Sequence, residues 1–245
     1  LYRRGELLVA SFPADQTVQI QTEAGIRDEL QILVQPGVSY LGLNTLSGPT
    51  SDVNVRRAIA SAIDRQALID TVLQQPWHVS TQSLIPPGII GAQEGPPDVG
   101  YAYDPEAARA FLAEAGYGPD NPPDPIDLWY NREGNNALLF AAIGEMLEQV
   151  GIPVRLTSSN WNVYLSSLEA CNAPNQQGAE KTPADCPYGA YRMGWVLDYA
   201  DPASLLDVVF HPASAFQYTG WKSDEYGTIL EQTRTEQDPE ARAAL

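Results

Sequence analysis

The chain has 245 residues, of which 44% are hydrophobic and 18% are charged, so it is expected to bury a core and is unlike a disordered tail. Its 31 acidic and 14 basic residues give a formal charge of −17, which repels nucleic-acid phosphates and anionic lipid surfaces. We therefore expect no nucleic-acid partner, although the same charge is typical of an ordinary hydrated surface. No run of 18 apolar residues is present, so the sequence predicts no membrane-spanning helix.

The first residues read "LYRRGELLVASFPAD", without an initiator Met or a signal-peptide pattern. We expect the chain to be a piece of a longer protein, in which case the missing leader says nothing about its compartment. Further on, "ELQILVQPGVSYLGLNT" has two apolar runs on either side of Pro36-Gly37. A turn dipeptide between apolar runs predicts two paired strands.

The stretch "SDVNVRRAIASAIDRQALIDTVLQQ" changes to a helical period. Apolar residues at the i, i+3, i+4, i+7 spacing predict an amphipathic helix with one buried face: Val55, Ala58, Ile59, Ala62 and Ile63. Asp64 is expected to cap a second helical segment that carries Leu68, Ile69 and Leu73. The Pro- and Gly-rich residues 76–100 have no sustained period and predict a long loop.

The second half alternates helices with strands, which is typical of the α/β class. In "YDPEAARAFLAEAGY", Asp104 is a predicted N-cap, Pro105 the first helical residue and Gly116 the stop. Residues 126–131, 135–150 and 152–158 then predict a strand, a helix and a strand, and hence a parallel β-α-β unit. A helix at 161–170, a strand at 189–197 and helix caps at Ser223 and Asp238 complete the pattern.

Two cysteines, Cys171 and Cys186, lie in a polar stretch whose spacing fits no metal motif. A disulfide between them is the better interpretation, and two free surface thiols are the alternative. A bridge of this kind persists in oxidising compartments.

A search for catalytic motifs finds no nucleotide-binding glycine loop, no nucleophile elbow and no HExxH, so neither a cofactor nor a metal is expected. The histidines, His78 and His211, are interpreted as surface or core residues. Asp198 and Asp201 provide the one candidate carboxylate pair, and a hydrolase using both is the alternative function. Their i, i+3 spacing is equally well explained by capping of a turn. We therefore expect no enzyme.

Four landmarks occur in a fixed order: "GELLVA", "YLGLNT…DVNVRRAIASAIDRQALID", "YDPEAARAFLAEAGY" and "GWVLDYADPASLL". Together they resemble the family 5 extracellular solute-binding proteins, the receptor subunits of peptide- and nickel-type ABC importers. The resemblance runs through nearly the whole chain. It implies a type II periplasmic-binding-protein lobe with a mixed sheet flanked by helices, in which residues 1–43 are the end of the first lobe with hinge strands. Residues 44–245 would be the second ligand-binding lobe, incomplete at its C-terminus.

The resemblance also assigns roles within "YRMGWVLDYADP", residues 191–202. By position, Asp198 would pair with a peptide's α-amino group and Arg192 would meet its carboxylate, while Trp195 and Tyr199 would form the walls of the pocket. A buried charge without a partner is costly, so such groups select the opposite charge in a ligand. The alternative is that Arg192 and Asp198, which alternation would place on one face of a strand, bind each other or surface partners.

The function implied is that of a monomeric receptor that binds a small solute, most simply an oligopeptide, between two lobes and delivers it to the permease subunits of an ABC importer. Its expected location is extracytoplasmic, either the periplasm or a lipid-anchored position at the outer face of the cell membrane. A structural or docking role for the fragment is a third possibility.

Overall fold

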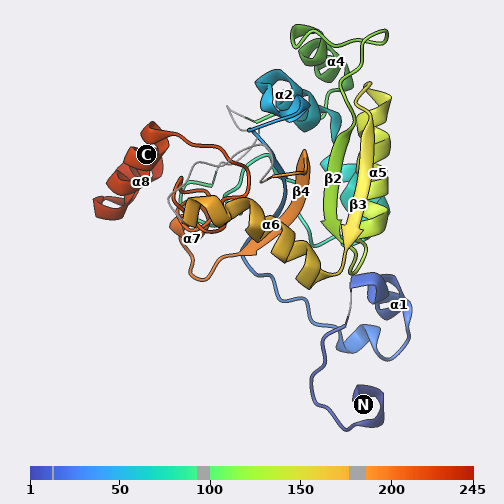
Figure 1. Ribbon diagram of the computed structural model, residues 1–245. Helices are drawn as coiled ribbons and strands as arrows, with labels where there is room; N and C mark the ends of the chain where they lie inside the picture. Colours follow the sequence, from blue (N-terminus) through green and yellow to red (C-terminus); the bar gives the residue numbers. More distant parts are fainter. Residues whose placement is uncertain (13, 93–99, 177–185) are drawn as a thin grey trace.

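The computed structural model describes residues 1–12, 14–92, 100–176 and 186–245. A four-stranded sheet with the order β1-β4-β2-β3 forms its centre (Figure 1). Its strands are β1 (Gly37–Leu43), β2 (Ile126–Asn131), β3 (Val154–Ser159) and β4 (Ala190–Val196). β2 runs parallel to both β3 and β4, whereas β1 is antiparallel to β4. The expected mixed sheet and the expected parallel β-α-β unit are both confirmed.

Most helices lie close to the predicted residues, but α6 runs beyond the predicted end at residue 170 and α7 was not predicted. The helices are α2 (Val53–Ala62), α3 (Arg65–Ala67), α4 (Pro105–Glu114), α5 (Asn136–Gln149), α6 (Trp161–Gln176), α7 (Ala203–Leu206), α8 (Asp224–Thr235) and α9 (Pro239–Ala244). The Asp104 carboxylate accepts the amides of Glu106 and Ala107, which starts α4 at Pro105. Ser223 and Asp238 cap α8 and α9 as expected. A π-helical segment, η5 (Leu68–Leu73), follows α3, whose cap is Asp64.

Two apolar clusters cover the two faces of the sheet. On one face, α2, α4 and α5 pack against β2 through a cluster that includes Val55, Leu112, Leu128, Phe140 and Ala190. On the other face, α6 packs against β4 through a second cluster, which includes Tyr164, Leu168, Tyr191 and Met193. Figure 1 shows α5 and α6 on opposite sides of the strands. Successive residues of β4 therefore alternate between the two clusters.

The prediction that the two apolar runs on either side of Pro36-Gly37 pair with each other is wrong. Residues 37–43 do form a strand, but β1 pairs with β4 along its whole length, and residues 30–36 form no strand. The chain continues through Pro36, whose carbonyl accepts the amide of Leu197 (2.9 Å). β1 thus pairs with β4 and not with the preceding run. In this position Leu41 and Leu43 pack against the first cluster.

Residues 1–36 form an N-terminal segment with little regular structure. It contains α1 (Thr17–Thr22) and the short 3-10 helices η1 (Tyr2–Arg4), η2 (Ala14–Gln16) and η3 (Arg27–Glu29). In Figure 1 this blue segment lies beyond the end of the sheet at which the arrows of β2 and β3 terminate. Gln75 donates to the Thr17 hydroxyl (3.2 Å), which ties the segment to the body of the molecule.

The long loop predicted over residues 76–100 is confirmed where the structure describes it. Residues 76–92 and residue 100 contain neither helix nor strand, and residues 93–99 lie outside the described part of the chain. One more 3-10 turn, η4 (Pro49–Ser51), leads into α2.

Candidate functional site

The stretch of residues 191–202 begins inside the sheet and leaves it at one particular edge. Because β2, β3 and β4 are parallel, their carboxyl ends meet at the same edge, where ligands of α/β sheets bind. Arg132 follows β2, Trp161 begins α6 shortly after β3, and Asp198 follows β4. Of the residues predicted for the site, Asp198 and Tyr199 thus follow the carboxyl end of β4, whereas Arg192 and Trp195 lie within the strand.

Arg192 lies within β4 and is half-buried. Its backbone carbonyl accepts the hydroxyl of Tyr164 from α6, which fixes the strand at this position. Burial lowers the pKa of the Arg192 guanidinium, and the nearby Tyr164 and Tyr40 partly oppose that shift. No carboxylate among the described residues forms an ion pair with it. Arg192 is therefore a half-buried cation that the described residues leave without an ion-pair partner.

Asp198 does not share a strand face with Arg192, because β4 ends at Val196. The chain turns there, and the amide of Asp198 donates to the hydroxyl of Ser204 (2.8 Å), a buried residue of α7. The Asp198 side chain is exposed and forms no ion pair within the described part of the chain. The two charges therefore do not bind each other, which removes one alternative to a ligand role.

The two aromatic residues of the predicted pocket differ in environment. Trp195 is half-buried and packs on Phe216 with ring centroids 5.2 Å apart, and its indole N–H is buried with no acceptor among the described groups. Tyr199 is 53% exposed. Trp195 is thus part of the core beneath the edge, and Tyr199 is the aromatic ring that a ligand can reach.

Asp201 has a structural role that the sequence could only suggest. Its carboxylate accepts the amide of Ala203 (2.8 Å), which caps α7, and it pairs with both terminal nitrogens of Arg242 from α9. The Arg242 guanidinium holds the pKa of Asp201 below its usual range. With both oxygens engaged, Asp201 fits the turn-capping interpretation and not a hydrolytic pair with Asp198.

The remaining arginines show how unusual Arg192 is. The sequence has twelve arginines, and six of them form ion pairs with carboxylates: Arg3, Arg4, Arg27, Arg155, Arg234 and Arg242. Four more donate to carbonyl oxygens or neutral side chains: Arg56, Arg57, Arg65 and Arg109. Within the described residues, only the guanidinium groups of Arg132 and Arg192 have neither kind of partner.

Arg132, Glu133 and Trp161 were missed by the sequence analysis. Arg132 is exposed at the carboxyl end of β2, and its amide extends the pairing of β2 with β3 by donating to Ser159 (2.9 Å). The Glu133 carboxylate accepts the Asn131 side chain (2.8 Å) and the Trp161 amide (2.9 Å), and these bonds lower its pKa. The signal that could have identified these residues was their position directly after two predicted parallel strands.

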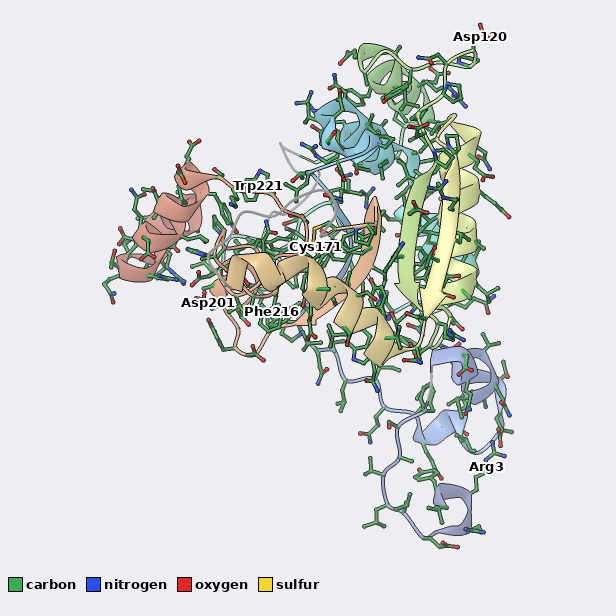
Figure 2. All side chains as sticks on the ribbon, viewed as in Figure 1. Arg3, Asp120, Cys171, Asp201, Phe216 and Trp221 are labelled. Atoms are coloured by element: carbon green, nitrogen blue, oxygen red, sulfur yellow. A yellow bond between two sulfur atoms is a disulfide. The ribbon has the colours of Figure 1, made fainter. Side chains whose placement is uncertain are left out.

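The predicted disulfide is present between Cys171 in α6 and Cys186. Figure 2 labels Cys171, with its sulfur in yellow. Asn44 donates to the carbonyls of Cys186 and Tyr188 (both 2.9 Å), so the segment that leads into β4 is held from two sides. The bridge and Asn44 together fix the start of the strand that carries Arg192.

The described residues contain few candidates for other kinds of site. In the part of the chain that the structure describes, no group of three or more His, Cys, Asp or Glu residues is suited to a metal, and no helix is long and apolar enough to cross a membrane. Two surface hollows of about 330 and 300 Å³ lie beside α8 and α9. Neither is lined by Arg192 or Asp198.

Comparison with protein families places the chain in one class. The family model described as "Bacterial extracellular solute-binding proteins, family 5 Middle" matches residues 1–217. The chain belongs to this family.

Individual relatives agree with that class. The chain is 27% identical over 251 residues to the oligopeptide-binding protein OppA of Bacillus subtilis, covering 100% of this chain and 43% of the relative. It is 30% identical over 229 residues to a dipeptide-binding protein of Escherichia coli, covering 88% and 38%. The solved structure of the E. coli murein tripeptide-binding protein MppA superposes with a TM-score of 0.79 at 26% identity, covering 96% and 43%. The chain thus spans less than half the length of these relatives.

Proposed function

We propose that this chain is the ligand-contacting part of a receptor that binds short peptides outside the cytoplasm and delivers them to the permease of an ABC importer. The observation that carries the proposal is the pair of opposite charges at one sheet edge. Asp198 is exposed and Arg192 is half-buried, and neither forms an ion pair within the described residues. A peptide zwitterion has a cationic amine and an anionic carboxylate, which match these two groups.

The spacing of the two charges fits a short peptide. Six residues of extended chain separate Arg192 from Asp198, which limits their Cα distance to about 20 Å. A peptide of a few residues has the same rise per residue and spans that distance or less. Tyr199, exposed beside Asp198, then offers a surface for the first side chain of the peptide.

The lobe assignment belongs to the same proposal. Residues 1–43 form the end of a first lobe with hinge strands, and residues 44–245 form the second lobe. The exposure of Asp198 and Tyr199 supports this, because ligand sites usually bury most of the ligand surface and the other lobe could cover these side chains. The receptor acts as a monomer, without a cofactor, in the periplasm or anchored by a lipid at the outer face of the cell membrane.

The test is Asp198→Asn in the intact protein, with calorimetry on a free peptide and on its N-acetylated form. The substitution keeps the size of the side chain but leaves the bound amine without its counter-ion, which costs on the order of 2–5 kcal/mol. Affinity for the free peptide should fall at least about thirtyfold, and the melting temperature should hardly change. Wild type should bind the acetylated peptide much more weakly than the free one.

Asp201→Asn is the matched control, because it removes the same charge three residues away. Since Asp201 pairs with Arg242 and caps α7, this variant should lose stability and keep its affinity. If wild type binds the free and the acetylated peptide equally well, Asp198 does not bind the amine and the peptide proposal is wrong.

A second measurement separates a receptor from an enzyme. A receptor returns its ligand unchanged, so mass spectrometry of a peptide incubated with the intact protein should find the peptide alone. Time-dependent cleavage that Asp198→Asn abolishes would support the hydrolase instead.

A further inference from the structure

The two arginines whose guanidinium groups have no ion-pair or hydrogen-bond partner in the described residues occupy related positions in the sheet. Arg192 lies in β4 and Arg132 directly follows β2, the strand next to it. Ten other arginines of the chain are bonded, so two unbonded guanidinium groups on neighbouring strands are unlike the general pattern. An unneutralised cation at an edge where ligands bind indicates the charge of the ligand.

The register places both arginines on one face of the sheet. Trp129 of β2 and Tyr191 of β4 form the last pair of this ladder. Tyr130 and Arg192 are the next residues of the two strands, and Arg132 follows Tyr130 by two residues toward the carboxyl edge. Ala190 and Tyr130 both belong to the cluster under α5, and alternation therefore assigns Arg192 and Arg132 to that same face. Strand spacing and residue rise put their Cα atoms about 8 Å apart, within reach of two long side chains around one ligand group.

The neighbouring carboxylate does not neutralise this pair. Glu133 is the acidic residue next to Arg132, which contributes through space to the lowered pKa of Glu133, but no ion pair among the described residues joins the two. Its oxygens accept the Asn131 side chain and the Trp161 amide, which hold the loops after β2 and β3 together. Arg132 thus remains available at the edge, and its exposed guanidinium is matched to carboxylates by its planar, two-pronged geometry.

We propose that Arg132 is a specificity-determining residue that, together with Arg192, selects peptides whose last residue is acidic. Arg192 binds the α-carboxylate, and Arg132 binds the carboxylate of the terminal Glu or Asp side chain. The inference rests on the proposed peptide function and adds to it the chemical class of the last residue. A net charge of −17 opposes acidic ligands at long range, so a preference for them needs local cations of this kind.

The experiment measures binding of three tripeptides to the intact protein: Ala-Ala-Glu, Ala-Ala-Gln and Ala-Ala-Lys. Wild type should bind the Glu peptide about tenfold more tightly than its neutral isostere, because a charge-assisted pair replaces a neutral hydrogen bond. Arg132→Gln should remove that ratio, because it weakens binding of Ala-Ala-Glu much more than binding of Ala-Ala-Gln. Arg132→Glu should reverse the preference, so that Ala-Ala-Lys binds better than Ala-Ala-Glu.

Arg109→Gln is the matched control. Arg109 is exposed on α4 and donates to the carbonyl of Gln149, so its loss changes the net charge equally but lies outside the carboxyl edge. This variant should retain the wild-type ratio, and a ratio lost in both variants would mean that long-range charge alone sets the preference. Circular dichroism should show the same fold for all variants, since Arg132 has no bonded partner to lose in the described structure.

The outcomes also separate this inference from the proposed function. If wild type binds the Glu and Gln peptides equally well, or if Arg132→Gln keeps the ratio, the role of Arg132 is wrong while the peptide receptor stands. If wild type binds none of the three peptides and also fails to bind a mixed peptide library, both proposals are overturned.

Discussion

The N-terminal segment, residues 1–36, and the body, residues 37–245, both contain apolar runs, but only the body buries them. Among the described residues of the segment, Thr17 alone is buried, whereas Leu8, Leu33 and Val34 are all more than 80% exposed. In the body, runs of similar composition form β1, β2 and β4 and lie inside the two clusters.

The difference lies in the partners and not in the residues. The run at 37–43 finds β4 beside it, and every residue from Gly37 to Leu43 has a partner there. The run at 32–34 has no neighbouring strand in the described chain. A strand needs both a paired backbone and a covered face, so apolar composition alone does not form one. The contrast therefore divides the chain near residue 37, inside residues 1–43, which are proposed as the end of the first lobe with hinge strands.

The largest expected effect tests the contrast with two matched truncations, Leu128→Ala and Leu33→Ala. Leu128 is fully buried in β2, and its truncation should cost about 2–5 kcal/mol of unfolding free energy. Leu33 is 83% exposed, so its truncation in this 245-residue chain should change stability by no more than about 0.5 kcal/mol. Urea unfolding measures both.

The same two truncations, made in the intact protein, test whether a first lobe covers the N-terminal segment. If a first lobe covers the segment, Leu33→Ala should there cost nearly as much as a core truncation. An equally small cost in the intact protein would show that the segment stays uncovered, and it would contradict the lobe proposal.

The disulfide should give the next largest effect, and it concerns the body alone. Cys171 and Cys186 are both fully buried in the second cluster, and the bridge closes a loop with a sequence separation of 15. Replacing both by Ala should lower stability by roughly 3 kcal/mol, mainly because the unfolded chain gains freedom. Thermal unfolding measures this loss, with Leu33→Ala as a control outside the body.

A thiol titration checks the bridge itself. Unreduced, denatured wild-type protein should contain no reactive thiol. Two thiols per chain would show that the bridge does not form, and would also weaken the proposal of an extracytoplasmic location, since oxidising compartments favour such bonds.

Much of this architecture could be predicted from local pattern. The helical face from Val55 to Ile63, the cap at Asp104 and the stop at Gly116 depend on residues close together in the sequence, and the structure confirms them. The partner of β1 could not be predicted, because β4 lies about 150 residues away and turn chemistry at Pro36-Gly37 favoured a hairpin.

The candidate site likewise contains residues that the sequence could identify and residues that depend on distant partners. Resemblance singled out Arg192 and Asp198, but it did not find Arg132, since this residue becomes relevant only once β2 and β4 are known to be neighbours. The different roles of Asp198 and Asp201 likewise became clear only from the ion pair of Asp201 with Arg242, which lies on α9 near the end of the sequence.

The smallest expected effect compares one ion pair from each region. Asp201 and Arg242 in the body have side chains 24% and 21% exposed, whereas Arg3 in the N-terminal segment is 60% exposed and pairs with Glu23 (Figure 2 labels Asp201 and Arg3). Water and salt screen the exposed pair more strongly, so Arg3→Gln should give no measurable change. Arg242→Gln should cost up to about 1 kcal/mol, because it also removes the bond to the Thr233 carbonyl that holds α9 against α8.

The dependence on pH distinguishes this pair from a purely apolar contact of α9. Arg242 lowers the pKa of Asp201 in the folded protein. The ion pair therefore contributes its full share of the folding stability at pH values above the pKa of Asp201 in the unfolded chain, which is about 3.9. It is lost as the pH falls through the lower folded value, when the carboxylate takes up a proton. The difference in stability between wild type and Arg242→Gln should therefore be constant from pH 6 to about pH 5 and shrink below about pH 4. A difference that stays constant down to pH 2 would show that α9 is held by packing alone, and that Asp201 contributes to the body no more than Arg3 contributes to the segment.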